Sequence, residues 1–246
     1  MDNIELKFEK INYVLPFIFV EGTKATPFLF GSGKDSIEVT IRDYYISQFT
    51  ITQKLYEHLV GFNPANNKGN DIPVECVSYN ELIMENGFLE KINDTEIKGK
   101  IAGLINSPSS VQFRLPSETE WEYAAKGGRN WTDSFVFSGS NSIDEVAWYK
   151  DNSFNKSWPV GRKKPNQLGI YDMSGNIWEW CQDYYHSDMD KIPRDGSHCL
   201  EESDERVLRG GCFHNWAIHC TSAKRYAIMP QFKDPCISFR LVMSFE

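Results

Sequence analysis

The feature that most constrains the fold is the near absence of helical periodicity from the second half of the chain. Residues 129–246 are rich in Asn, Asp, Gly, Trp and Tyr, and turn sequences such as KKPNQLG (163–169) and PRDGS (193–197) divide them into short pieces. Such a segment does not build a core from long amphipathic helices. Because aromatic residues make up 14% of the chain, we expect the packing of large rings to hold this half together.

The first half carries clearer signals of regular structure. Partly alternating apolar residues predict strands over 14–22 and 36–47. A helix is predicted over 50–61, with Thr52 as its N-cap and Gly61 at its end.

Two further helices are predicted from their start signals. One covers 74–93 and is capped by Ser78. The strongest prediction covers 115–128, where Ser117 and Glu120 have the spacing of a capping box and two glycines follow. A few helices among many short strands indicate an α+β fold class.

Composition and charge exclude several classes of protein. The 246 residues are 41% hydrophobic and 24% charged, as in an ordinary globular protein. A net charge of −8 argues against binding to nucleic acid or anionic membranes, since such binders carry a basic face. No apolar run approaches the roughly 20 residues of a membrane helix, and the apolar stretch 11–20 lacks the basic start and cleavage site of a signal peptide.

The organisation of the chain is expected to be simple. There is no linker, charge block or repeat, so we expect one domain over 1–246 and a monomer. The six cysteines form no CxxC pair, which leaves a structural zinc site without support. The compartment stays open between the cytoplasm and, for a chain trimmed of an export segment, the cell surface.

Three long motifs in this order give the chain a family resemblance. They are FRLPSETEWEYAAKGG (113–128), WPVGRKKPNQLGIYDMSGNIWEWCQDYY (158–185) and a third that begins RVLRGGCF (206–213) and ends SFRLV (238–242). Together they resemble the formylglycine-generating enzyme (sulfatase-modifying factor) family over most of the chain. The resemblance implies a variant of the C-type lectin fold, loop-rich with few helices and short strands.

The resemblance also implies a calcium site within the second motif. Asp172 and Glu179 would be side-chain ligands, and Gly175 and Ile177 would offer backbone carbonyls. Oxygen ligands around a tight turn suit calcium. The alternative is that Asp172 caps the turn and no metal binds. In either case the segment supports the fold, and no cofactor is required for the function expected below.

In the oxidases of the family, the segment after Gly-Gly carries two cysteines five residues apart that bind copper(I). Soft thiolates suit this ion, which activates oxygen to oxidise a substrate cysteine. This chain has Asn215 at the first of these positions and Cys220 at the second, so copper is not expected. Alternative copper ligands within the segment would be a Cys212–Cys220 pair, or Cys220 with His214 and His219.

A third interpretation follows from non-oxidase relatives, in which certain residues of this segment recur at fixed positions. We call these the frame residues. The frame residues in this chain are Gly210, Gly211, Ala217, Cys220, Ser222, Ala223, Arg225, Pro230, Ile237, Phe239 and Arg240. Between them, nine positions hold residues that the codon AAC reaches by changes at adenines alone. These replaceable positions are His214, Ile218, His219, Tyr226, Ala227, Phe232, Asp234, Pro235 and Cys236.

Replacement of template adenines is typical of diversity-generating retroelements, whose variable proteins resemble this chain in frame. Cys212 follows in the same way from the serine codon AGC, whereas Trp216, Lys224 and Met229 would need other template codons. The segment at about 209–242 is therefore expected to display a diversified face that binds a protein ligand through exposed aromatic and polar groups.

The candidate ligand-binding residues are Cys212, His214, Asn215, Trp216, Ile218, His219, Lys224, Tyr226, Ala227, Ile228, Met229, Gln231, Phe232, Lys233, Asp234 and Cys236. Phe213 and Ile237 flank frame residues and are expected in the core. Two alternatives stay open: an undiversified non-catalytic relative, and a copper-dependent oxidase acting on a substrate cysteine. Burial of Trp216, Tyr226 and Phe232 would argue against a binding face.

Overall fold

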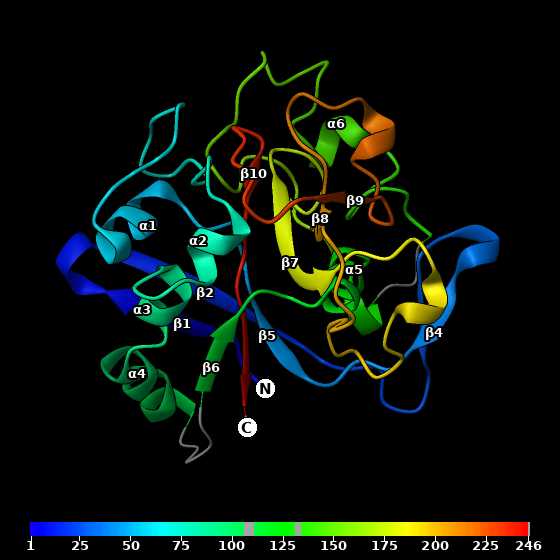
Figure 1. Cartoon of the computed structure of the whole chain (residues 1–246), viewed down its shortest axis with the longest axis horizontal. Helices are drawn as coiled ribbons and strands as arrows, with labels where there is room; N and C mark the ends of the chain where they lie inside the picture. Colours follow the sequence, from blue (N-terminus) through cyan, green and yellow to red (C-terminus); the bar gives the residue numbers. More distant parts are fainter. Residues whose placement is uncertain (106–110, 131–133, 246) are drawn as a thin grey trace.

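The largest sheet joins the two ends of the chain. The structure is a computed structural model that describes residues 1–105, 111–130 and 134–245. Five antiparallel strands are arranged in the order β1-β2-β5-β11-β6 (Figure 1). They are β1 (Ile4–Phe8), β2 (Tyr13–Val20), β5 (Tyr44–Ser47), β11 (Val242–Phe245) and β6 (Val111–Arg114). The C-terminal strand therefore lies inside a sheet that the N-terminal strand begins.

A second sheet carries the C-terminal segment. Its order is β10-β7-β8-β9, with β10 parallel to β7 and the other neighbours antiparallel. Its strands are β7 (Trp178–Tyr184), β8 (Arg206–Arg209), β9 (Arg225–Ile228) and β10 (Ile237–Ser238). A small hairpin consists of β3 (Phe28–Phe30) and β4 (Ile37–Val39). The connections 210–224 and 229–236 leave and re-enter the second sheet, and they carry most of the candidate face.

The helices are short. They are α1 (Gln53–Val60), α2 (Tyr79–Ile83), α3 (Phe88–Ile92), α4 (Thr95–Ile105), α5 (Glu118–Ala125) and α6 (Ile143–Val146). Single turns of 3-10 helix occur as η1 (Glu9–Ile11), η2 (Gly33–Asp35), η3 (Gly128–Asn130), η4 (Met189–Lys191) and η5 (Ala217–His219). In the described part of the chain, no helix has the length and apolar character needed to cross a bilayer.

The predicted start signals are confirmed. Ser78 caps α2, and Ser117 caps α5 in a capping box in which the Ser117 N–H donates to Glu120 Oε2 (2.8 Å) and the Glu120 N–H to Ser117 Oγ (3.1 Å). The α1 helix follows Thr52 and ends at Gly61, which has a φ of 95°. Thr52 makes no side-chain capping hydrogen bond, so position alone identifies it as the N-cap.

Two predicted elements are each divided in the structure. The prediction of one helix over 74–93 is wrong, because the chain leaves α2 and turns through Asn86 (φ 60°) before α3. At the next residue, Gly87, a Cβ atom would lie 2.6 Å from the Glu81 carbonyl oxygen, so only glycine fits at this point of the turn. The predicted strand over 36–47 likewise consists of β4 and β5.

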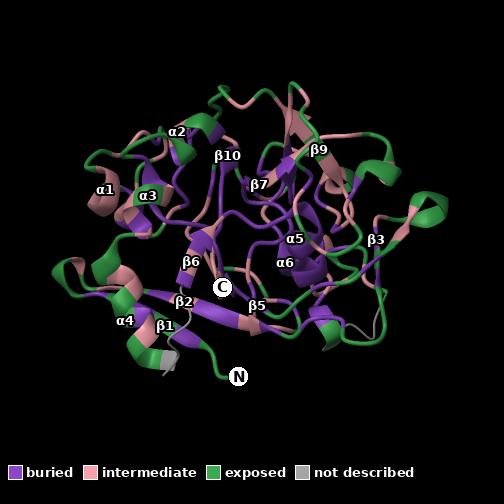
Figure 2. Ribbon diagram, turned by 60° about the horizontal axis from the view of Figure 1, so that its bottom comes forward, coloured by how far each residue is buried: buried purple, intermediate pink, exposed green. Residues whose placement is uncertain are grey.

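Buried residues recur along β2 and β6 of the first sheet, which are partly purple in Figure 2. All four residues of β5 are buried; Tyr45 joins one apolar cluster, whereas Tyr44 and Ile46 join another. Trp121 and Trp180 are wholly buried in different clusters. In the second half of the chain, for which ring packing was expected, Trp180 and Phe239 are fully buried and the Trp148 ring stacks on Trp158 at 4.4 Å.

Candidate functional site

The α5 helix fixes the start of the candidate face through a buried ion pair. Arg209, the last residue of β8, is fully buried and donates to Glu118 (2.9 Å) and Glu122 (2.5 Å) of α5. It also donates to the Ser222 carbonyl (2.7 Å). Burial opposes ionisation of Glu118, but Arg225 and Arg209 hold the pKa of its carboxyl below the ordinary value. The chain therefore leaves the second sheet at Gly210, directly after an arginine that buried hydrogen bonds hold in place.

The other two arginines of the segment are paired in the same way. Arg225, at the start of β9, makes two 2.7 Å hydrogen bonds to Glu118. Arg240, fully buried beyond β10, donates to both oxygens of Glu179, at 2.6 and 2.8 Å. Since Glu118 belongs to the first motif and Glu179 to the second, the third motif is joined to each of the other two by its own buried ion pairs.

The replaceable positions lie outside the core. None of the nine is buried: six are exposed, and His219, Ala227 and Cys236 are intermediate. Among the frame residues, Gly210, Gly211, Cys220, Ser222, Ile237, Phe239 and Arg240 are buried. Burial therefore distinguishes seven of the eleven frame residues from the replaceable positions, whereas the frame residues Ala217, Ala223, Arg225 and Pro230 have intermediate exposure.

Large apolar groups of the candidate face are open to solvent. Trp216, Tyr226 and Phe232 keep 53%, 49% and 44% of their surface exposed, and Ile218 keeps 71%. Because Trp216, Tyr226 and Phe232 are not buried, their placement does not argue against a binding face.

The remaining candidates divide by exposure. Those exposed are Met229, Gln231 and Lys233, and those of intermediate exposure are Asn215, Lys224 and Ile228. Cys212 departs from the expectation, since it keeps only 2% of its surface and lies in the core beneath the face. Phe213 and Ile237 are core residues, as expected.

The backbone of the segment is anchored to distant parts of the chain. The Phe213 N–H donates to the Asn176 carbonyl (3.0 Å), and the Lys150 N–H donates to the Asn215 carbonyl (3.0 Å). Further along, the Asn80 N–H donates to the Pro230 carbonyl (3.1 Å). These bonds use main-chain atoms, so they do not depend on which side chains the segment carries.

Three residues outside the segment shape the face and were missed from the sequence. The Lys150 ammonium lies 3.8 Å from the centre of the Trp216 ring, and the Trp178 ring stacks on Tyr226 at 5.3 Å. Glu81 of α2 pairs with Lys233. No spacing in the sequence links these residues to the segment, and only the fold brings them together.

The residues at the copper positions of the oxidases are not a thiolate pair. The Asn215 side chain accepts a hydrogen bond from the Cys212 N–H (3.0 Å). Cys220 is fully buried, and burial, with the neighbouring Cys212, raises the pKa of its thiol to about 12. Within the described residues, no group of three or more His, Cys, Asp or Glu side chains is arranged to hold a metal ion.

The predicted calcium ligands do not form a complete donor set. Both oxygens of Glu179 are engaged, by Arg240 and by the Thr50 hydroxyl and Trp121 indole, each at 2.7 Å. Asp172 accepts from the Gly161 N–H (2.8 Å) through Oδ2, while its buried Oδ1 has no partner. Asp172 leaves one oxygen open for a cation, but Glu179 is already satisfied by a positive charge, so the four residues do not fit calcium as they stand.

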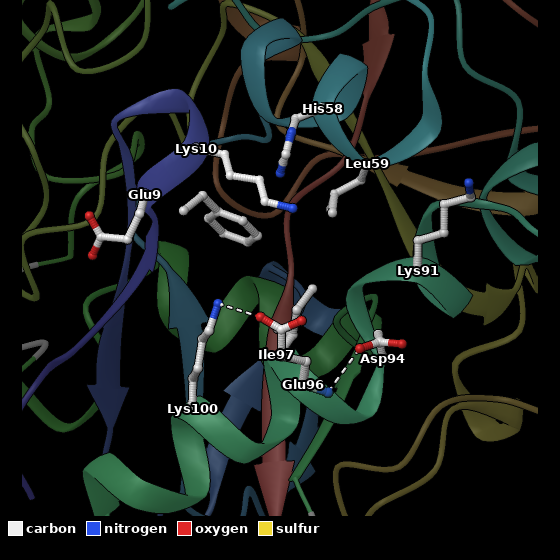
Figure 3. A pocket seen from close by; sticks show the side chains of 10 residues that line it. Glu9, Lys10, His58, Leu59, Lys91, Asp94, Glu96, Ile97 and Lys100 are labelled. Atoms are coloured by element: carbon white, nitrogen blue, oxygen red, sulfur yellow. Dashed lines mark hydrogen bonds and ion pairs between the residues drawn. The ribbon is translucent and has the colours of Figure 1, made fainter.

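A surface depression of about 540 Å³ lies elsewhere, between η1, α1, α3 and α4 (Figure 3). Its side chains carry both signs of charge, and Lys100 is paired with Glu96 at 3.1 Å. None of its lining residues belongs to the C-terminal segment. It is therefore separate from the candidate face.

Comparison with protein families shows which family the chain belongs to. The profile of the sulfatase-modifying factor enzyme 1-like domain matches residues 19–245. The chain belongs to this family. The resemblance of its three motifs is thereby confirmed.

Relatives in the family have diverse names. A chaperone protein LppX of Paenibacillus barcinonensis is 36% identical over 182 residues, which are 60% of this chain and 64% of that protein. A serine/threonine-protein kinase Pkn1 of Chlamydia trachomatis is 28% identical over 96% of this chain and 40% of its own. The formylglycine-generating enzyme of Streptomyces coelicolor is 31% identical over 47% of this chain and 40% of its own. The chain thus spans less than two thirds of the length of these relatives.

Solved structures show the fold. Treponema denticola variable protein 1 superposes with a TM-score of 0.78 at 24% identity, over 98% of this chain and 99% of that one. PvdO from Pseudomonas aeruginosa superposes with a TM-score of 0.73 at 22% identity, over 98% of both chains. The family member described here has the predicted loop-rich α+β fold, of the C-type lectin-like kind found in formylglycine-generating enzymes.

Proposed function

We propose that this chain is a non-catalytic ligand-binding protein whose C-terminal segment is a diversified face, as in retroelement variable proteins. The observation that carries the proposal is exposure: none of the nine replaceable positions is buried, although Cys212, derived in the same way from a serine codon, lies in the core. A fold that tolerates replacement needs its variable side chains outside the core. The likeness in fold to a protein named as a variable protein agrees with this proposal.

The ligand that suits this face best is a protein. The exposed rings of Trp216, Tyr226 and Phe232 offer rigid apolar area, and His214 and Asp234 offer polar contacts beside them. Aromatic anchors with adaptable polar neighbours are what protein-binding surfaces use. The expectation of a monomer stays a prediction, which light scattering of the purified chain tests.

The copper-dependent oxidase is the alternative that the family keeps open. It requires a pair of thiolates, whereas Asn215 occupies one position and Cys220 holds its proton in the core. A direct test is aerobic incubation of the chain with copper and a peptide containing Cys-x-Pro-x-Arg. Conversion of the peptide cysteine to formylglycine would overturn the binding proposal, and we expect no conversion.

Diversification is tested in the coding DNA. A near-copy of the segment that differs only at adenines, close to a reverse transcriptase gene, is the expected finding. If no such copy exists, the undiversified family relative becomes the better description, while the binding face itself stays open to test.

Ligand binding is tested with matched variants. The chain is immobilised and used to capture proteins from cell extracts, in parallel with Phe232→Ala and Phe62→Ala. Phe232 and Phe62 have similar exposure, 44% and 49%, but only Phe232 lies on the face. We expect capture to fall for Phe232→Ala alone. A ligand retained equally by both variants would contradict the proposed face.

A further inference from the structure

A stacked pair of tryptophans lies outside the C-terminal segment and carries two lysines. The centres of the Trp148 and Trp158 rings are 4.4 Å apart, and their planes are 11° from parallel. The Lys163 ammonium lies over the Trp148 ring at 4.2 Å, and the Lys156 ammonium lies over the Trp158 ring at 4.8 Å. Cation–π contacts therefore hold two positive charges close to this ring pair.

Asn176 joins the tryptophan pair to the start of the candidate face. This fully buried residue donates its N–H to the Trp148 carbonyl (2.7 Å), and its side chain bonds both the N–H (2.9 Å) and the carbonyl (3.1 Å) of Trp158. Its own carbonyl accepts from the Phe213 N–H (3.0 Å). The buried Ser153 hydroxyl donates to the Phe213 carbonyl (2.9 Å). None of these five residues is a replaceable position, so the support does not depend on diversification.

A third lysine connects this region to the face itself. The Lys150 ammonium lies over the ring of the face residue Trp216 at 3.8 Å. Lys150 and Lys156 are exposed, and neither they nor Lys163 form an ion pair with another described residue. Residues 150–164 contain five Lys or Arg and one acidic residue, in a chain whose net charge is −8. The surface beside the candidate face is therefore positive on a chain that is negative as a whole.

An exposed ring projects from the same loop. Phe154 keeps 82% of its surface exposed and has a φ of 56°, a conformation that is rare for a residue with a bulky side chain. Its ring centre lies 6.3 Å from that of Trp158. The Trp158 indole donates to the Ser153 carbonyl (2.7 Å), and the Asn155 N–H donates to the Ser153 hydroxyl oxygen (3.1 Å), so the loop is held in place. Backbone strain imposed by such contacts recurs at binding sites.

We propose that this loop is a constant rim of the candidate face and recognises an acidic surface of the protein ligand. The rim consists of Lys150, Phe154, Lys156 and Lys163. Its ammoniums pair with carboxylates of the ligand, and the Phe154 ring enters an apolar depression between them. The inference rests on the proposed function, because it takes the neighbouring segment as a binding face. Since the rim lies outside that segment, it selects acidic ligands whichever side chains the replaceable positions carry.

The contacts of the tryptophan rings favour an acidic protein over a nucleic acid. Single-stranded nucleic acids are held by bases that stack on free aromatic faces, whereas the Trp148 and Trp158 rings are engaged by each other and by lysines. The negative charge on the rest of the chain repels a long polyanion. A compact group of carboxylates is governed mainly by the charges within a Debye length, about 10 Å at 0.1 M salt, and here these are the lysines of the rim.

The experiment measures the binding of two fluorescein-labelled decapeptides to the full chain by fluorescence anisotropy. One peptide is decaglutamate, and in the other two leucines replace the central pair of glutamates. We expect both peptides to bind at low salt, and the leucine peptide to bind more tightly because Phe154 covers its apolar side chains. Since exposed charges are screened by salt, a tenfold increase in sodium chloride is expected to weaken both by about tenfold.

Matched variants separate the rim from the charge of the whole chain. The double variant Lys150→Ala, Lys156→Ala is compared with Lys7→Ala, Lys34→Ala. All four lysines are exposed, so both variants lose the same charge without disturbing the core. We expect about threefold weaker peptide binding for each rim lysine, hence about tenfold for the first variant, and less than about twofold for the second.

The aromatic part of the rim is tested in the same assay. Phe154→Ala should lose the preference for the leucine peptide, whereas Phe62→Ala, at a residue that is 49% exposed and lies elsewhere, should keep it. The Tm of each variant checks that its fold is intact.

Three results would overturn the inference. One is an equal loss of binding in the two double variants. Another is the absence of saturable binding up to about 1 mM peptide. The third is tighter binding of a ten-nucleotide DNA strand than of decaglutamate, which would assign the rim to nucleic acid.

Failure of the proposed function gives a different result. Phe232→Ala should leave the binding of both peptides unchanged, because Phe232 lies outside the rim. If the rim variants lose peptide binding while Phe232→Ala still captures the protein ligand, the diversified face is refuted and the rim stands.

Discussion

Replacing Asp172 by Asn tests the electrostatics of the segment that was predicted to bind calcium. Asp172 is buried with a φ of 58°, accepts one hydrogen bond from Gly161 and has no partner for Oδ1. Burial raises its pKa from 3.8 to about 6. The folded chain therefore binds the proton more tightly than the unfolded chain, and stability falls as the pH rises from about 4 to about 6.

The magnitude follows from the same pKa. A rise from 3.8 to about 6 corresponds to about 3 kcal/mol of unfolding free energy, lost by the wild type between low and neutral pH. Asn keeps the acceptor for Gly161 and tolerates the left-handed backbone. Its buried amide group adds a constant cost of about 1–3 kcal/mol, which does not depend on pH.

The assay is urea unfolding at pH 4, 6 and 8. We expect the stability of Asp172→Asn relative to the wild type to improve by about 2.5 kcal/mol from pH 4 to pH 8, because part of the effect is already lost at pH 4. The exposed Asp204→Asn is the control and should show no such trend. A difference between Asp172→Asn and wild type that is constant with pH would refute the reasoning.

Calcium is tested with the same pair of proteins. Because Arg240 already neutralises Glu179, we expect 1 mM calcium chloride to leave the Tm of the wild type unchanged at pH 8. A rise in Tm for the wild type that is absent from Asp172→Asn would instead establish the calcium site predicted from the sequence.

Other predictions concern the supports of the face. Arg209→Met removes the cation that two buried carboxylates share, leaving Glu118 with Arg225 and Glu122 with Lys126, so it should cost about 3 kcal/mol in urea unfolding; a cost below 1 kcal/mol would contradict the role given to this ion pair. Ser117→Ala removes one half of a capping box, and with it the hydrogen bond that the Ser117 hydroxyl donates to the Gly196 carbonyl, so it should cost about 1 kcal/mol or more in the same assay. A Cβ atom at Gly211 would lie 2.7 Å from Cys220 Sγ, and the residue has a φ of +77°, so Gly211→Ala is expected to lower Tm. An unchanged Tm would show that the backbone around Gly211 adjusts without cost.

Local hydrogen bonding made part of the fold predictable. The capping boxes of α2 and α5 lie within four consecutive residues, so the sequence displays them directly. By contrast, no sequence signal identified α4, which contains Gly99 and Gly103 and packs the fully buried Ile101 into the core. Its glycines weaken helix propensity, and tertiary packing decides its structure.

The exposure of the candidate residues could be predicted where frame residues were recognised in the sequence. It could not be predicted where contacts between residues far apart in the sequence determine it. Outward placement of the replaceable positions followed from the frame, but the burial of Cys212 did not. Glu179 illustrates the same limit: its partner Arg240 lies 61 residues along the chain. A single sequence does not reveal that the carboxylate is satisfied by an arginine when a cation is also plausible chemistry for it.

The N-terminal strand β1 and the C-terminal strand β11 belong to one sheet, and this determines which way the candidate face points relative to the chain ends. N- and C-termini emerge together at the lower side of the molecule in Figure 1, whereas β9 and β10 lie at its upper side. A tether, membrane anchor or partner domain attached at either end would therefore hold the candidate face pointing away from the point of attachment. A probe joined to either terminus should leave the face accessible, so the orientation of display is built into the order of the strands.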